Sequence, residues 1–168
     1  ESEYVCFEKP SDSNGFATLN IDKIEAAVSY IAQYVSNLFK VKLMKMLWYV
    51  DAISYKTSGF AMTGLVYRHN DLGALPIGHY SLMNLKNLNV HEEESFNCDS
   101  MFRVLPTKGM DYTVLSAEDK QVLDTVIKKF KNYSAKEIVT YMHQERAYRE
   151  TKSGEIIPFS LAKDIKNF

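Results

Sequence analysis

The stretch that decides the fold is residues 42–57, Lys-Leu-Met-Lys-Met-Leu-Trp-Tyr-Val-Asp-Ala-Ile-Ser-Tyr-Lys-Thr. Its apolar residues recur at intervals of three and four, which is the spacing of one helix face. The residues on that face are Leu43, Met46, Leu47, Val50 and Ile53, and Met44, Trp48 and Tyr55 widen it. A helix that is apolar on most sides packs against neighbours all round. We therefore expect a central, buried helix that ends at Gly59 in a left-handed turn.

Other parts of the chain carry helix start signals. Asn20 is a good N-cap, Pro76 suits a first helical position, and Ser116 and Ser134 each stand three residues before an acidic residue, as in a capping box. Ser160 is expected to cap a last helix. The expected helices cover residues 20–37, 77–88, 116–130, 134–144 and 160–167.

Strand signals are fewer. Residues 65–67 are a short β-prone stretch between turn-forming residues, and residues 155–157 are a second one. Residues 89–96 and 100–106 are expected to form a β-hairpin joined by Asn97-Cys98-Asp99. The pattern predicts an α+β fold, a mostly helical single domain with a central apolar helix and a small antiparallel β-sheet or hairpin. Residues 1–19 are expected to be a linker or N-terminal arm, and residues 20–168 the domain.

Composition narrows the class of protein. The 168 residues are 46% hydrophobic and 24% charged, as in an ordinary globular domain. The 20 basic and 21 acidic residues leave a net charge of −1, so nucleic-acid binding through this domain is not expected. No apolar run approaches a membrane span, and the two cysteines lack the spacing of a zinc site or a disulfide framework. We expect a cytoplasmic protein with no membrane association.

Catalytic signals are weak. His143 beside Glu145 is the minimal set for general acid–base catalysis, but no nucleophile or metal set accompanies it. We expect both residues to be structural, satisfying backbone groups where a helix ends. The chain lacks the glycine-rich motifs GxxxxGK(S/T) and GxGxxG, which bind phosphates and dinucleotides. It also lacks the GxSxG motif, which carries the nucleophilic serine of many hydrolases. The sequence therefore predicts no enzyme, no cofactor and no metal.

Charged clusters are interpreted as solvated faces. The run His91–Glu94 looks like a metal site but lacks a second ligand group at suitable spacing, so we expect an exposed strand tip. Two lysine clusters, which are expected to lie on solvated helix faces rather than to bind phosphate, consist of Lys40, Lys42 and Lys45, and of Lys128, Lys129 and Lys131.

Several motifs, in order, resemble one family. The stretch 42–51 resembles the Lys-Leu-x-Lys-Leu-Leu-aromatic-aromatic-small helix of the Panacea-domain antitoxins. Gly64-Leu65-x-Tyr67 is similar to the strand that follows, and Gly73-Ala74-Leu75-Pro76 stands where the family usually has Gly-Pro-Val-Pro. Leu115-Ser116, Ser134-Ala135-Lys136, His143-x-Glu145 and Gly154-Glu155-Ile156 resemble its C-terminal pattern. The similarity is closest to members whose domain follows a zinc-binding ribbon and helix-turn-helix module.

The resemblance implies a function and a set of structural positions. It implies a bacterial, prophage-associated antitoxin of a toxin–antitoxin system, which neutralises a cognate protein toxin encoded next to it by direct binding. The 11 tyrosines and 9 phenylalanines suit such an interface, and a homo-oligomer is left open. The motif positions expected to be structural are Lys42, Leu43, Lys45, Leu47, Tyr49, Asp51, Gly64, Gly73, Pro76, His143 and Glu145.

A contact surface and two rival functions complete the predictions. The partner is expected to bind an irregular segment between residues 67 and 80, through Tyr67, Arg68, His69, His79 and Tyr80. Alternatively, the two tyrosine rings pack the sheet against the third helix. One rival function is a DNA-binding transcriptional regulator, acting through this chain or through a module upstream of Glu1. The other is a small enzyme that uses His143 and Glu145.

Overall fold

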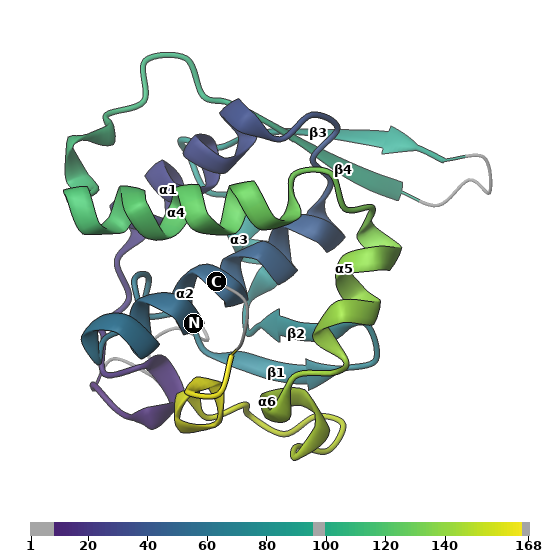
Figure 1. The fold of residues 1–168 in the computed structure, drawn as a ribbon. Coiled ribbons are helices and arrows are strands. Elements are labelled where there is room, and N and C mark those ends of the chain that lie inside the picture. The colour runs from purple at the N-terminus through teal and green to yellow at the C-terminus, as the bar shows by residue number, and fades with distance from the viewer. Residues whose placement is uncertain (1–8, 96–99, 166–168) are drawn as a thin grey trace.

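The computed structural model describes residues 9–95 and 100–165. Within them the chain forms six α-helices, three short 3₁₀ helices and two two-stranded antiparallel sheets, so the predicted α+β class is confirmed (Figure 1). The helices are α1 (Ile21–Tyr34), α2 (Lys40–Ser58), α3 (His79–Met83), α4 (Ala117–Phe130), α5 (Ala135–Met142) and α6 (Arg146–Arg149). The strands are β1 (Tyr67–Asn70), β2 (Gly73–Pro76), β3 (Asn89–Glu94) and β4 (Ser100–Leu105), and the 3₁₀ helices are η2 (Asp12–Asn14), η3 (Tyr112–Val114) and η4 (Phe159–Ala162).

Helix α2 is the centre of the molecule, as its sequence predicts. Every residue from Lys42 to Tyr55 is buried, and Leu47 and Val50 are completely inaccessible to solvent. The helix runs between α4 and the β1–β2 hairpin, with α5 at one side (Figure 1). Gly59 ends it with a φ of 86°, the left-handed conformation that glycine adopts at little cost.

Local capping fixes the starts of three other helices. The side chain of Asn20 accepts from the amide of Lys23 at 3.0 Å at the start of α1. Ser116 and Ser134 form complete capping boxes with Asp119 and Glu137 at the starts of α4 and α5. These three predicted helix starts are confirmed, because each depends on side chains within one turn.

The two sheets are separate hairpins. In β1–β2, Tyr67 pairs with Pro76 and Asn70 with Gly73. In β3–β4, Asn89 pairs with Leu105, which confirms the hairpin expected at residues 89–106 in its described part. The expected connection, Asn97-Cys98-Asp99, lies outside the described residues. The β3–β4 hairpin extends away from the helical body (Figure 1).

The predicted third helix is mostly wrong. The sequence indicates a helix over residues 77–88 that opens after Pro76, whereas α3 has only five residues and Pro76 ends β2. Pairing of Pro76 with Tyr67 keeps this part of the chain extended, and Gly78 then adopts a φ of 79°. The segment between residues 67 and 80 is therefore a hairpin followed by a short helix, and not irregular.

The C-terminal predictions also need correction. In place of the helix expected over residues 160–167, the chain forms the four-residue 3₁₀ helix η4, and its N-cap is Pro158 rather than Ser160. Residues 166–168 lie outside the described residues. The strand expected over residues 155–157 is a single bridge between Ile156 and Arg68. The segment lies along β1, because the amide of Ile157 donates to the carbonyl of Tyr67 at 2.9 Å and the amide of His69 donates to the carbonyl of Glu155 at 2.8 Å.

A buried carboxylate links α2 to the segment before β1. Asp51 is fully buried and accepts four hydrogen bonds, from the amide of Met62 at 2.9 Å, the amide and hydroxyl of Thr63 at 2.8 and 2.6 Å, and the hydroxyl of Tyr67 at 2.7 Å. Burial raises the pKa of Asp51, while the four donors act in the opposite direction. The network fixes where β1 begins relative to α2.

The described part of the N-terminal arm, residues 9–19, packs on the same end of the molecule. The amide of Ala61 donates to the carbonyl of Gly15 at 2.9 Å, and the carboxylate of Asp12 accepts from the amide and hydroxyl of Ser160. Gly64 lies so close to the arm that a Cβ atom on it would stand 2.4 Å from the carbonyl oxygen of Thr18. These contacts join the arm, η4 and the end of α2.

Candidate partner-binding groove

An apolar groove of about 320 Å³ lies between the start of α2, the β1–β2 turn, α3 and β4. We call it the groove. Residues from α2, β1, β2, α3, β4 and the segments next to them line it, and most of these residues are hydrophobic. They are Phe39, Lys40, Val41, Met44, Lys45, Asn70, Leu72, Leu75, His79, Tyr80, Met101 and Phe102.

Large apolar side chains at the groove remain open to solvent. Tyr80 at the start of α3 is 71% exposed, and Leu72 in the β1–β2 turn is 50% exposed. The ammonium group of Lys40 stands 4.2 Å from the ring centre of Tyr80 and 5.7 Å from that of Phe102, which is a cation–π arrangement. Lys40 thus contacts both rings at the N-terminal end of α2.

Lys45 forms part of the groove's floor. Its side chain is almost completely buried, and its Nζ donates to the carbonyl oxygen of Ala74 at 2.9 Å. Burial lowers the pKa of Lys45 to about 8, and the positive charge of Lys40 adds to this effect. The expectation that Lys42 and Lys45 lie on a solvated helix face is wrong, because Lys42 is also buried and donates to the carbonyl of Lys131 at 3.0 Å.

The five residues predicted to contact a partner divide into two groups. His79 and Tyr80 line the groove. Tyr67 does not, and its expected exposure is wrong: its ring is completely buried because its hydroxyl reaches Asp51 in the core. Arg68 lies exposed on β1 and donates to the carbonyl of Gly154 at 3.2 Å.

His69 belongs to a different cluster. Its ring stacks on Tyr148 with 3.7 Å between centroids, and its Nδ1 lies 2.8 Å from the hydroxyl of Thr151. Burial and the positive charge of nearby His143 lower the pKa of His69. The cluster attaches β1 to α6, so Arg68 and His69 lie outside the groove.

His143 and Glu145 do not meet in the way that general acid–base catalysis needs. The Nδ1 of His143 lies 2.6 Å from the carbonyl oxygen of Val139, in the last turn of α5, and its Nε2 lies 3.1 Å from that of Asp71. The carboxylate of Glu145 instead accepts from the hydroxyl of buried Tyr49 at 3.1 Å. Burial raises the pKa of Glu145. The two side chains thus contact different groups.

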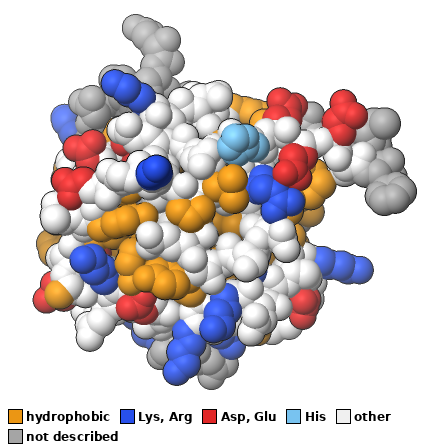
Figure 2. Space-filling model, turned by 90° about the horizontal axis from the view of Figure 1, so that it is seen from above, with side chains coloured by type: hydrophobic (Ala, Val, Ile, Leu, Met, Phe, Trp, Pro, Cys, Tyr) orange, Lys and Arg blue, Asp and Glu red, His pale blue; other side chains and the backbone are white. Residues whose placement is uncertain are grey.

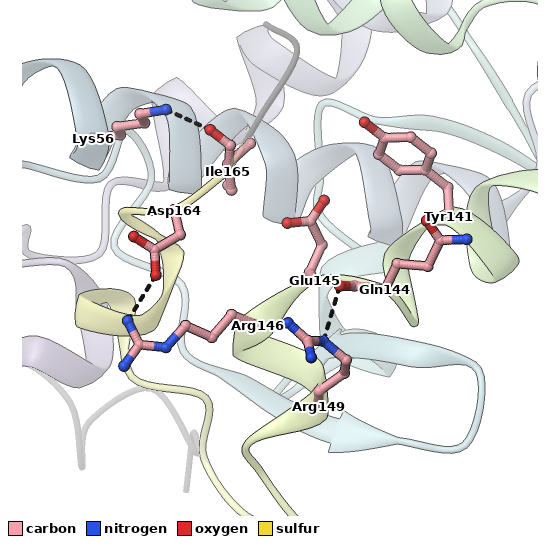
Figure 3. Close-up of a pocket in the computed structure, with 8 residues that line it drawn as sticks. All are labelled: Lys56, Tyr141, Gln144, Glu145, Arg146, Arg149, Asp164 and Ile165. Atoms are coloured by element: carbon pink, nitrogen blue, oxygen red, sulfur yellow. Dashed lines mark hydrogen bonds and ion pairs between the residues drawn. The ribbon is translucent and has the colours of Figure 1, made fainter.

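Glu145 lines a larger cavity of about 550 Å³ near α6 and the end of α2 (Figure 3). Its cationic side chains bond to acceptors of the protein itself. Arg146 pairs with Asp164 at 2.7 Å and with Glu150, Arg149 donates to the carbonyl of Gln144, and Lys56 donates to that of Ile165. This cavity therefore contains a carboxylate that pairs with one of its cations, whereas the lining of the groove includes no aspartate or glutamate among the described residues.

A second apolar surface lies over α1, α4 and the segment before α4. Hydrophobic side chains gather in the middle of this face, and charged side chains border it (Figure 2). Tyr30 contacts both Tyr34 and Tyr112, with ring centroids 5.2 and 6.0 Å apart. The hydroxyls of Tyr30 and Tyr112 bond to Asp124 and Ser29. Two of the three rings are therefore tied to the fold.

Two other kinds of site are not found in the described residues. Among residues 9–95 and 100–165, no group of three or more His, Cys, Asp or Glu side chains is placed to hold a metal ion. In the same part of the chain, none of the helices combines the length and the apolar character needed to cross a bilayer.

Sequence reasoning missed most of the groove. Lys40, Leu72 and Phe102 come from segments about 30 residues apart, and nothing local links them. One signal was present: Leu72 is a large apolar residue that directly follows the turn-forming pair Asn70-Asp71. An apolar side chain at a hairpin turn is solvent-exposed unless a partner covers it.

Comparison with known proteins identifies the family. A family model described as "Antitoxin SocA-like, Panacea domain" matches residues 43–148, which is more than half of the chain. This chain therefore belongs to the SocA-like, Panacea-domain antitoxin family, and the resemblance seen in the sequence is confirmed. No curated protein and no solved structure matches the chain. The expected likeness to members with a zinc-ribbon and helix-turn-helix module stays a prediction.

Proposed function

We propose that this chain is the antitoxin of a bacterial toxin–antitoxin pair and that it neutralises a cognate protein toxin in the cytoplasm by binding it directly. Membership of an antitoxin family supports this proposal. The observation that carries the contact surface is the groove, where Tyr80 and Leu72 expose large apolar area around a concave opening. Aromatic anchors of this kind contribute most of the binding energy in protein interfaces.

The proposed neutralisation needs an interface and no chemical turnover. A stable complex of standard size buries about 1,600 Å² in total, of which the groove would form the apolar centre and the surrounding polar surface the rim. The side chains best suited to acid–base chemistry, His143 and Glu145, already bond to internal groups. We propose binding without metal, cofactor or catalysis.

DNA binding is the less favoured function. The net charge of −1 gives the chain no excess of cations to neutralise phosphates. A gel-shift assay with the chain at physiological salt, using DNA from its own promoter, tests this alternative directly.

Co-expression with the product of the neighbouring gene tests the proposed function. The wild-type chain is expected to restore growth and to co-purify with that protein. The double variant Leu72→Ala/Tyr80→Ala is expected neither to restore growth nor to co-purify with the neighbouring gene's product. Its melting temperature should equal that of the wild type, because the side chains of Leu72 and Tyr80 are exposed.

Two further variants locate the contact surface. Tyr34→Ala removes a tyrosine that is 56% exposed on the second apolar surface, and Arg68→Glu reverses a charge on the exposed side of β1. Both are expected to retain the complex. No complex with the wild-type chain would contradict the antitoxin proposal, whereas loss of the complex only in Tyr34→Ala or Arg68→Glu would move the contact surface away from the groove.

A further inference from the structure

The groove combines apolar walls with an excess of positive charge. Lys40 and Lys45 both line it, and none of the lining residues in the described part of the chain is an aspartate or glutamate. Glu92 lines the adjoining smaller cavity, together with Lys40, Tyr80 and Phe102, but not the groove. The charge of the groove is therefore not balanced by a carboxylate within its own lining.

The start of α2 adds to this positive potential. Phe39 is its N-cap and makes no side-chain capping bond, and the first turn contains no acidic residue. Helix starts carry unsatisfied amides and a partial positive charge, so an acidic side chain is favoured there and a lysine is not. Lys40 is nevertheless the first residue of this 19-residue helix.

Some cations of the protein pair with carboxylates. Lys23 pairs with Asp119 at 2.9 Å, and Arg103 pairs with Glu93 at 2.7 Å. Lys40 instead faces two aromatic rings, and Lys45 bonds to a carbonyl oxygen. Lys40 is half-buried, and this burial lowers the pKa of its ammonium group. A partner carboxylate would remove this imbalance.

We propose that the groove binds an acidic segment of the partner protein, in which a carboxylate lies beside Lys40 and neighbouring apolar side chains contact Tyr80 and Leu72. This inference rests on the proposed function and specifies the chemistry of the partner. Complementary charge across an interface selects the correct partner and accelerates association. Apolar anchors on both sides of the carboxylate exclude water from the ion pair.

Charge reversal tests the inference. Affinity for the neighbouring gene's product is measured for the wild-type chain and for Lys40→Met, Lys40→Glu and Lys128→Glu. Lys128 is exposed on α4, so its reversal changes the net charge by the same amount away from the groove. Lys40→Glu is expected to weaken binding about a hundredfold and Lys40→Met about tenfold, whereas Lys128→Glu stays within about twofold.

A matched exchange on the partner separates charge pairing from a change of shape. Each acidic residue of the neighbouring gene's product is changed singly to lysine, and the products that remain toxic are tested against both antitoxins. One or more of them is expected to be neutralised by Lys40→Glu and to escape the wild-type chain. The melting temperature of Lys40→Met should equal or exceed that of the wild type, because a lysine at a helix start is unfavourable.

The outcomes separate the two proposals. If the wild-type chain does not bind the neighbouring gene's product, the proposed function fails. If it binds, but Lys40→Glu binds as well as Lys128→Glu does, the acidic-segment inference is overturned and the antitoxin proposal stands. Weakened binding that no acidic-to-lysine exchange restores also overturns the inference, since Lys40 would then act through its shape.

Discussion

The hydroxyl of Tyr67 donates a 2.7 Å hydrogen bond to the carboxylate of Asp51, and both side chains are completely buried. Sixteen residues separate them in the sequence. The bond is one of four that the carboxylate accepts, and it joins the first residue of β1 to the middle of α2. Asp51 thereby positions the hairpin that forms one wall of the groove.

Removal of this bond is expected to destabilise the protein. Tyr67→Phe keeps the ring and its packing but leaves the buried carboxylate with one donor fewer, which should lower the free energy of unfolding by about 1.5–3 kcal/mol. Urea denaturation measures the change. The control is Tyr34→Phe, whose ring is largely exposed, and an equal loss in both variants would contradict the role given to the Asp51 network.

Leu47 is expected to contribute to stability and Leu72 is not. Leu47→Ala leaves a cavity in the centre of α2 and should cost about 2–5 kcal/mol. Leu72→Ala removes the same atoms from a half-exposed turn and should change stability by less than about 0.5 kcal/mol. Chemical denaturation of both variants provides the comparison. A midpoint that does not move for Leu47→Ala would contradict its burial.

Alanine substitutions at Gly64 and Gly154 distinguish the cost of a steric clash from the cost of backbone strain. Both have φ near 80°, so alanine at either position is strained by about 1–2 kcal/mol. At Gly64 the new Cβ would also meet the backbone of Thr18 and Leu19, whereas at Gly154 nothing lies within 4 Å. Thermal melts should therefore show a larger loss for Gly64→Ala than for Gly154→Ala. Equal decreases in melting temperature would mean that residues 18 and 19 move away from the new Cβ atom at no cost in stability.

Lys45 should make stability rise with pH in the alkaline range. Its pKa is about 8 in the folded protein and about 10.4 in an unfolded chain, so the unfolded state binds more protons between these values. The contribution of Lys45 to the free energy of unfolding therefore increases from pH 8 towards pH 10. The difference between the wild type and Lys45→Met, measured by urea denaturation across that range, should show this slope. A flat difference would place Lys45 in a more hydrated environment.

Local signals predicted those parts of the fold that depend on neighbours in sequence. Ser116 and Ser134 each bond within one helical turn, so the starts of α4 and α5 could be located from the residues alone. The third helix was overestimated because the pairing of Tyr67 with Pro76 is set by the position of β1, which depends in turn on Asp51. No periodicity near Pro76 contains that information.

The candidate site was predicted only in part for the same reason. The sequence predicts Tyr80 as a contact residue because it is an aromatic residue in a connecting segment, and the structure places it at the groove. The same reasoning predicts Tyr67 as a contact residue, but Tyr67 lies in the core. The difference between the two tyrosines is set by whether the hydroxyl reaches Asp51, which is a three-dimensional property. Lys40 and Phe102 meet only because β4 contacts α2 in the folded chain.

The acidic run of β3 has a consequence for behaviour at high concentration. Phe39 bridges β4 at Arg103, whereas β3 has no strand partner other than β4 among the described residues, and an unpaired edge invites a second copy to extend the sheet. Glu92, Glu93 and Glu94 are exposed along one of these strands. Bringing two copies of that strand together would crowd six carboxylates along one seam, a repulsion that salt weakens. The hairpin thus carries its own protection against fibre growth.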